Sequence, residues 1–338
     1  MRGVRADSFV METDIHYPTE SSLIRDGLRK VLAGSAALAE RVLVGGWRQH
    51  PHLYRKTRRL VREIERLAAR KGSGYQARLQ SQYGELLDLA SKVLERAEQL
   101  RGSRSVQESV DVQVLAGAVE LEKFLGLTRQ VCGTAVRRVF EGQSVPNKDK
   151  LFRLFETHTQ LYKRGKAGEP VQFGRQVLVY EDAVGFIIHA YLMPREQNDY
   201  DVVVKQTAAL QARLGGGIQQ ASFDRGFHSP ENQQELAKII PHLCLPKPGV
   251  NQAAEQEQQA TAAFHVSRQR HPGIESAIHA LQAGNGLERC RDRSEHGFRR
   301  YLQLGVLGRN LQVLGKILLA AHDVQSQAAQ SRRKKLAA

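Results

Sequence analysis

Residues 4–18, VRADSFVMETDIHYP, contain the pattern on which the fold class depends. Apolar and β-branched side chains surround an acidic centre, and the stretch ends at Pro18. This pattern predicts a strand from Val4 to Glu12, with Asp7 inside it. A strand at this position must find its partners elsewhere in the chain.

Helical spacing replaces the strand pattern from about Ser22 to Phe140. Apolar residues recur at intervals of three and four on two segments: Leu60, Ile64 and Leu67, and then Leu79, Tyr83, Leu86, Ala90, Val93, Leu94 and Ala97. Val114 to Phe140 repeats the spacing, and glycines predict breaks at Gly45-Gly46, at 71–74 and near Gly102-Ser103. This indicates a helical block of roughly 120 residues.

Strand patterns return after Pro146. We expect a short strand at Leu154–His158, a hairpin of Val171–Tyr180 and Val184–Leu192, and two more strands at Ile218–Phe223 and His242–Leu245. Helices are expected at Asp201–Leu214, after Ser229-Pro230, and through the C-terminal third. The fold class is therefore α/β: a sheet core interrupted by an all-helical insertion and followed by a helical C-terminal region.

The charge indicates a polyanionic partner. Fifty Lys and Arg against 35 Asp and Glu give a formal net charge of +15. Nine cations and only two acids lie between Arg48 and Lys71, which favours nucleic acid. No run of apolar residues approaches the roughly 18 needed to span a bilayer. Three scattered cysteines and no evident signal peptide suggest a reducing cytoplasm and no membrane.

Three acidic residues stand at strand or helix ends, where a metal site could form. Asp7 lies in the first strand, Asp224 ends a later one, and Glu275 opens a helix after Pro272. Carboxylates are the preferred ligands of the hard cations that activate water and stabilise leaving oxygens in phosphodiester chemistry. With 35 acidic residues available, this choice is weak on composition alone, and capping or surface roles explain any one of them.

A family resemblance strengthens the choice. The segments RADSFVMETDIHYPTESSLIRDG, KRGKAGEPVQFGRQVLVYED, ASFDRGFHSPEN and RQRHPGIESAIHALQAGNGLERCRDRSEHGFRRYLQLGVLGRNLQVLG occur in this order. The chain resembles DDE transposases of bacterial insertion sequences, of the ISNCY kind, over nearly its whole length. The resemblance implies an RNase H-like core, metal-dependent DNA cleavage and strand transfer with two Mg²⁺ or Mn²⁺ ions, and a homodimer acting on transposon ends and target DNA.

The resemblance also implies a domain plan and a metal-binding triad. Residues 1–20 would hold the first core strand, 21–145 the helical insertion, 146–325 the rest of the catalytic domain and 326–338 a basic tail. The motif acids fall on Asp7, Asp224 and Glu275, the last two 51 residues apart. Asp14 competes with Asp7, which we prefer because it lies within the strand pattern and is followed by Ser8.

Cations in three segments are candidate DNA contacts. Lys163, Arg164 and Lys166 surround a glycine-containing turn in a family motif, although an exposed basic loop explains them nearly as well. Arg268 or Arg270 could hold a phosphate near Glu275, and the sequence does not choose between them. The third group is Arg55, Lys56, Arg58, Arg59 and Arg62, expected to face DNA rather than the core.

The aromatic and imidazole side chains near that basic group have simpler explanations. Trp47, the only tryptophan, could stack on an unpaired base, but packing in the helical block is the favoured interpretation. His50 and His52 lack a partner spacing for zinc, so we interpret them as solvated.

One departure from the family limits the interpretation. Only six residues precede Asp7, where relatives carry a helical DNA-binding region, which is expected of a truncated copy, of a mis-called start or of one half of a split gene. The alternative function is a catalytically inactive DNA-binding remnant of a transposase. A third, supported only by residues 22–140, is a helical interaction protein. Metal binding by the three acids separates the first interpretation from both others.

Overall fold

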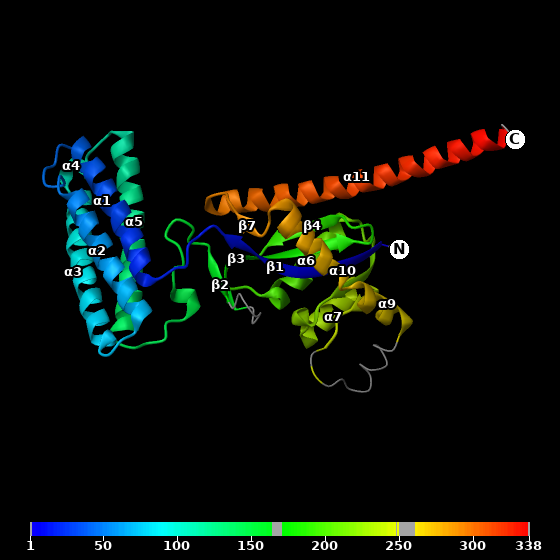
Figure 1. Cartoon of the computed structure of the whole chain (residues 1–338), viewed down its shortest axis with the longest axis horizontal. Helices are drawn as coiled ribbons and strands as arrows, with labels where there is room; N and C mark the ends of the chain where they lie inside the picture. Colours follow the sequence, from blue (N-terminus) through cyan, green and yellow to red (C-terminus); the bar gives the residue numbers. More distant parts are fainter. Residues whose placement is uncertain (1, 164–170, 248, 250–260, 337–338) are drawn as a thin grey trace. The chain divides into compact units, whose positions relative to one another are not determined.

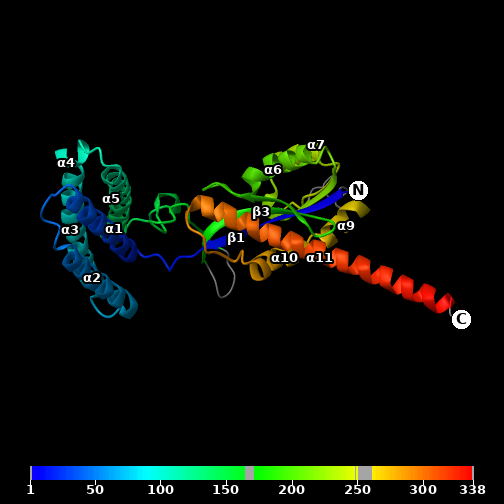
Figure 2. The same ribbon diagram turned by 90° about the horizontal axis from the view of Figure 1, so that it is seen from above.

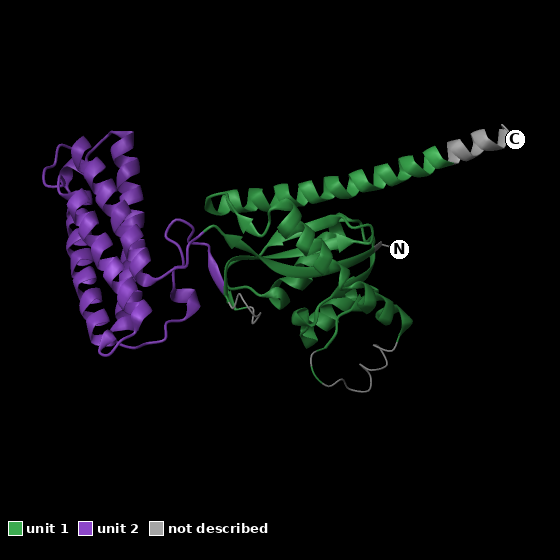
Figure 3. Cartoon of the chain, viewed as in Figure 1, with its two compact units in different colours: residues 1–14, 162–338 green, residues 15–161 purple. Residues whose placement is uncertain are grey.

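The computed structural model describes residues 2–163, 171–247, 249 and 261–336. The chain divides into two compact units (Figure 3). The sheet unit comprises residues 1–14 and 162–338, and the bundle unit comprises residues 15–161. The bundle unit is wider at both ends than the helical insertion expected at 21–145, because the segments that flank the helices pack with them.

The bundle unit is built from long helices in sequence order. They are α1 (Glu20–Arg41), α2 (His50–Arg70), α3 (Tyr75–Arg101), the short α4 (Arg104–Gln107) and α5 (Val112–Val139), followed by the 3-10 turn η1 (Asn147–Asp149). Thr19 caps α1 by accepting a hydrogen bond from the Ser22 amide, and Ser22 reciprocates. The breaks predicted at the three glycine-containing positions are confirmed.

The apolar stripes of these helices form one core. Ile24, Val61, Leu86 and Leu121 are buried in it. Trp47 is 6% exposed in the same core, and the Arg96 guanidinium lies 4.9 Å from its ring centroid. Packing, the favoured interpretation of Trp47, is thus what the structure has.

The sheet unit contains a mixed sheet centred on β1 (Figure 1). Its strands are β1 (Arg2–Thr13), β2 (Gln160–Lys163), β3 (Val171–Asp182), β4 (Ile187–Leu192), β5 (Ile218–Phe223), β6 (His242–Cys244) and β7 (Arg289–Cys290). β1 pairs antiparallel with β3 and parallel with β5, β3 pairs antiparallel with β4, and β5 pairs parallel with β6. The strand order is β2-β3-β1-β5-β6, with β4 paired to β3 and β7 paired to β1 off this path.

Helices cover both faces of this sheet. They are α6 (Asp199–Arg213), η2 (Arg225–Phe227), α7 (Pro230–Ile239), α9 (Ala262–Arg270), α10 (Gly273–His279), the π-helical η3 (Ala280–Gly284) and α11 (Ser294–Leu336). Figure 2 shows α6 and α7 on one face and α10 and α11 on the other. Each face has its own apolar core, one around Phe223 and Leu236 and one around Phe9, Ile274 and Phe298.

One sequence-based expectation needs correction. Leu154–His158 is irregular, and the strand of this region is β2, which begins at Gln160. Residues 326–336, most of the segment expected as a basic tail, are helical and continue α11. Among the described residues, Ser294–Gln327 of α11 is the one helical segment long and apolar enough to cross a membrane, by length and composition only.

Candidate active site in the sheet unit

Asp7 and Asp224 occupy neighbouring positions on two parallel strands. Ala6 of β1 pairs with Phe223 of β5, so the next residue on each strand is one of the two aspartates. Adjacent strands lie about 4.8 Å apart, which brings the two aspartates together. Asp224 follows the last residue of β5 and caps η2, its carboxylate accepting a hydrogen bond of 2.7 Å from the Arg225 amide. Asp7 accepts a 2.7 Å bond from the Ser8 amide.

Glu275 reaches the same region from α10. Ile274, its neighbour, is buried against the face of β1 that carries Phe9, and alternation along the strand puts Asp7 on that face too. Glu275 lies in the first turn of α10, as predicted, and is exposed. The sheet and α10 therefore present all three candidate carboxylates on one side of the fold.

A pocket of about 600 Å³ contains the three acids. Asp7, Asp224 and Glu275 all line it, together with Phe223, Arg225, Cys244, Pro246, Lys247, Gly249, Arg268, His271 and Pro272. Residues that are 51 and 268 positions away from Glu275 along the sequence thus share one cavity. The sequence analysis found these acids, but it could not show that they share a pocket.

Three cations line the pocket beside the three acids. They are Arg225, Lys247 and Arg268, contributed by η2, the segment after β6 and α9. Arg268 lines the pocket, and Arg270 is not among the described residues that do. The backbone oxygen of Arg270 instead accepts a 2.9 Å hydrogen bond from Arg5. The structure therefore favours Arg268 as the pocket-facing arginine of the two.

His271 connects the acids to the helical segment that carries Glu275. Its Nδ1 lies 3.1 Å from the Ser222 hydroxyl of β5. Burial lowers the pKa of His271, while the carboxylates of Asp224 and Glu275 raise it and Arg5 lowers it. Both carboxylates therefore act on the same imidazole. Burial is the largest of these influences on the pKa, and it favours the neutral imidazole of His271.

An ion pair between β1 and β3 anchors this segment. Arg5 of β1 lies 2.6 Å from Glu181 of β3, whose side chain is buried. A Cβ on Gly273 would overlap the Arg5 guanidinium, so the start of α10 fits closely over this pair because the residue is glycine. Arg5 thus holds the backbone that leads from α9 into α10.

The donor set of the pocket suits a divalent cation. Carboxylate oxygens are the ligands that Mg²⁺ and Mn²⁺ prefer, and Asp7, Asp224 and Glu275 supply them from three different elements. Among the described residues, however, no three His, Cys, Asp or Glu side chains are already gathered at metal-binding distance. The residues therefore fit such an ion by chemistry and by shared pocket.

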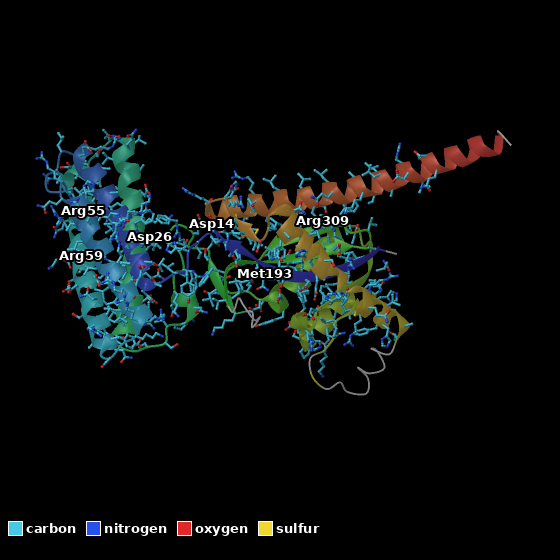
Figure 4. All side chains as sticks on the ribbon, viewed as in Figure 1. Asp14, Asp26, Arg55, Arg59, Met193 and Arg309 are labelled. Carbon is cyan, nitrogen blue, oxygen red and sulfur yellow. The ribbon has the colours of Figure 1, made fainter. Side chains whose placement is uncertain are left out.

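The competing aspartate and the turn cations have other positions. Asp14 follows the end of β1, is exposed, and lies 4.0 Å from Arg289 (Figure 4). It is not among the described residues that line the pocket. Lys163 ends β2 and is exposed. Arg164 and Lys166 lie outside the described residues.

A separate basic surface lies in the bundle unit. Five α2 side chains are exposed, and Figure 4 labels two of them, Arg55 and Arg59; the others are Lys56, Arg58 and Arg62. The opposite face of α2 buries Thr57, Leu60, Val61 and Ile64. We call the exposed cations Arg55, Lys56, Arg58, Arg59 and Arg62 the α2 basic face. His52 is exposed as expected, whereas His50 is partly buried, with Nδ1 3.0 Å from the Trp47 carbonyl.

Sequence reasoning missed Arg225, Lys247 and the Arg5–Glu181 pair. Arg225 directly follows a chosen acid in the segment FDRGF, so its position was a usable signal. Lys247 stands between two prolines, and nothing in that pattern indicates a pocket. Comparisons of the chain with protein-family models, with curated proteins and with solved structures found no match.

Proposed function

We propose that this chain is a DDE transposase that cuts DNA and joins the ends to a target. The observation that carries the proposal is the shared pocket of Asp7, Asp224 and Glu275, with both aspartates at neighbouring positions on parallel strands. The motif resemblance chose these three residues from the sequence, and their convergence is an independent support for it.

The strand arrangement of the sheet unit also supports the proposal of an RNase H-like core. A central strand with an antiparallel hairpin on one side and two parallel strands on the other is the arrangement that such a core requires. The insertion of 147 residues between β1 and the rest of the sheet explains why the first two acids are far apart in sequence.

The pocket residues divide into two roles. Asp7, Asp224 and Glu275 would hold the divalent ions, two in the expected mechanism, which supply a nucleophilic oxygen and stabilise the leaving one. Arg225, Lys247 and Arg268 would bind the phosphates on either side of the scissile bond. Arg5 donates a hydrogen bond to the Arg270 carbonyl and so holds the start of α10, the helix that contains Glu275.

The test measures nicking and metal binding separately. With Mg²⁺ or Mn²⁺, the chain should nick transposon-end DNA, and Asp224→Asn should abolish nicking while DNA affinity stays nearly unchanged. Asn keeps the size and one acceptor oxygen but loses the charge that holds a cation. Mn²⁺ binding, followed by electron paramagnetic resonance, should weaken in the same variant.

Asp14→Asn is the matched control because the same substitution is made outside the pocket. It should leave nicking and Mn²⁺ binding as in the parent chain. If Asp224→Asn nicks as fast as the parent, the site assignment is wrong. If neither chain nicks DNA or binds Mn²⁺ while both bind DNA, the chain is the inactive DNA-binding remnant instead.

A further inference from the structure

The helix α11 leaves a row of leucines exposed on its outer side. Their side chains are between 43% and 60% exposed, although each is large and apolar: Leu304, Leu307, Leu311, Leu314 and Leu318. We call these five residues the leucine seam. Single exposed leucines are common on protein surfaces, but a continuous row of five is an unfinished interface.

The spacing of the leucine seam is that of a coiled coil. Successive members are three, four, three and four residues apart, so they fill alternate a and d positions of a heptad repeat. They cover roughly 20 Å of helix length. Ile317 and Val324, 40% and 67% exposed, occupy the neighbouring g positions and widen the stripe.

The opposite side of α11 is already occupied. Phe298, Leu302 and Val306 are buried on that side in the core that contains Phe9 and Ile274, and Val313 is also buried. After Val313, no buried side chain occurs in the part of α11 whose side chains the structure describes, and the helix extends beyond the sheet (Figures 1 and 2). In proteins most of the stability of a helix comes from the packing of its apolar face, so this part of α11 would gain stability from a packing partner.

The charges of α11 point to a second helix rather than to lipid. Arg309 and Lys316 are the charged residues between Tyr301 and Leu319, and both fall at the f position, across the helix from the seam. Figure 4 marks Arg309. A membrane span is apolar all round, whereas this helix is interrupted by two cations and by Gln303, Asn310 and Gln312.

We propose that α11 pairs with α11 of a second copy of this chain along the leucine seam. A heptad seam of leucine is self-complementary, because two identical helices interlock their a and d side chains. No cation of the 301–319 segment has to be buried in that interface. A homodimer is already what the family resemblance implies; the new element is the surface that forms it, which does not depend on the proposed DNA chemistry.

The test compares two adjacent leucines of similar exposure. Leu318 lies in the seam, and Leu319, 66% exposed, lies at the b position outside it. By light scattering after size exclusion, the parent chain should have twice the 37.8 kDa of one chain. Leu318→Glu should weaken association by about 100-fold or more, since two leucines lose their burial, whereas Leu319→Glu should leave the dimer intact.

Three results would overturn the inference. One is a monomeric parent chain at micromolar concentration, which would mean that the seam is covered within one chain or not at all. Another is an equal effect of Leu318→Glu and Leu319→Glu on the mass. The third is a parent chain that co-floats with vesicles of phosphatidylcholine and phosphatidylglycerol, with both variants released equally. Both substitutions are at exposed sites, so the fold should survive, and circular dichroism checks this.

Discussion

Arg5 is the residue on which the geometry of the pocket depends. It bonds to Glu181 and to the Arg270 carbonyl, and its side chain is 25% exposed while that of Glu181 is 4% exposed. We expect Arg5→Met to lower the free energy of unfolding by about 3 kcal/mol at neutral pH, because Glu181 is left as a buried charge without this partner. Urea denaturation followed by circular dichroism measures this loss.

The loss should depend on pH in a defined direction. Burial raises the pKa of Glu181, and Arg5 and Arg309 oppose that rise. Because the folded-state pKa lies above the unfolded one, the contribution of this group to stability is greatest below the unfolded pKa and falls as pH rises through the folded pKa. Removing Arg5 raises the pKa further, so the deficit of Arg5→Met should shrink on acidification. A stability deficit of Arg5→Met that is constant with pH would contradict this account. As a control, Arg5→Met made in the Glu181→Gln background should cause a loss of free energy of unfolding that changes little with pH.

Among single residues, the sequence could identify acids but not their companions. Asp7, Asp224 and Glu275 each stand next to a strand pattern or a Pro-led helix start, and the family resemblance selected them from the 35 acidic residues. Lys247 and Arg5 reach the pocket and its support through strand register and loop path, which no local pattern encodes. Whether Arg268 or Arg270 faces the pocket likewise depends on where α9 ends, which the sequence leaves open.

The α2 basic face is a feature of one helix with its own expected result. Replacing Arg55, Lys56, Arg58, Arg59 and Arg62 with Gln should flatten the salt dependence of DNA binding. The logarithmic slope should fall by up to about 0.9 for each DNA phosphate that these cations neutralise in the parent complex. Fluorescence anisotropy with labelled duplex DNA at several salt concentrations measures the slope.

The control for that experiment removes the same charge from elsewhere in the bundle unit. Five exposed cations on other segments are suitable for replacement with Gln: Lys71, Arg78, Lys92, Arg104 and Lys123. This variant should keep most of the parent slope. Equal slopes for the two variants would mean that α2 is a solvated face and that only net charge matters.

Among helices and strands, local capping signals were reliable and short apolar runs were not. Ser229 caps α7 with Pro230 at its first position, as the sequence predicted. The apolar residues of Leu154–His158 pack against the bundle and do not form a strand. Leu154 is buried in the bundle core, and the Phe155 ring lies 5.7 Å from that of Phe124. The apolar character of α11 was missed because it recurs every three or four residues instead of forming a run.

At the scale of the whole molecule, the bundle unit has a complete core of its own. We therefore expect residues 15–161 to fold when expressed alone. Trp47 is the only tryptophan and is buried there, so its fluorescence reports on this unit. Urea unfolding of the fragment should be cooperative. Leu121→Ala should lower its free energy of unfolding by about 2–5 kcal/mol, because a fully packed leucine side chain is removed.

Leu115→Ala is the matched control on the same helix, since Leu115 is 46% exposed. It should change the free energy of unfolding by less than about 1 kcal/mol. A fragment without a cooperative transition would show that the bundle depends on the rest of the chain.

The insertion of the bundle unit after the first strand delays completion of the sheet during synthesis on the ribosome. β1 emerges first, but its antiparallel partner β3 begins only at Val171 and its parallel partner β5 at Ile218. At roughly 5–20 residues per second, β1 must wait on the order of ten seconds or more before either neighbour exists. For that interval the nascent chain exposes a strand with two open edges while the bundle can already close. A holding chaperone that binds short apolar strands has its natural target in residues 2–13.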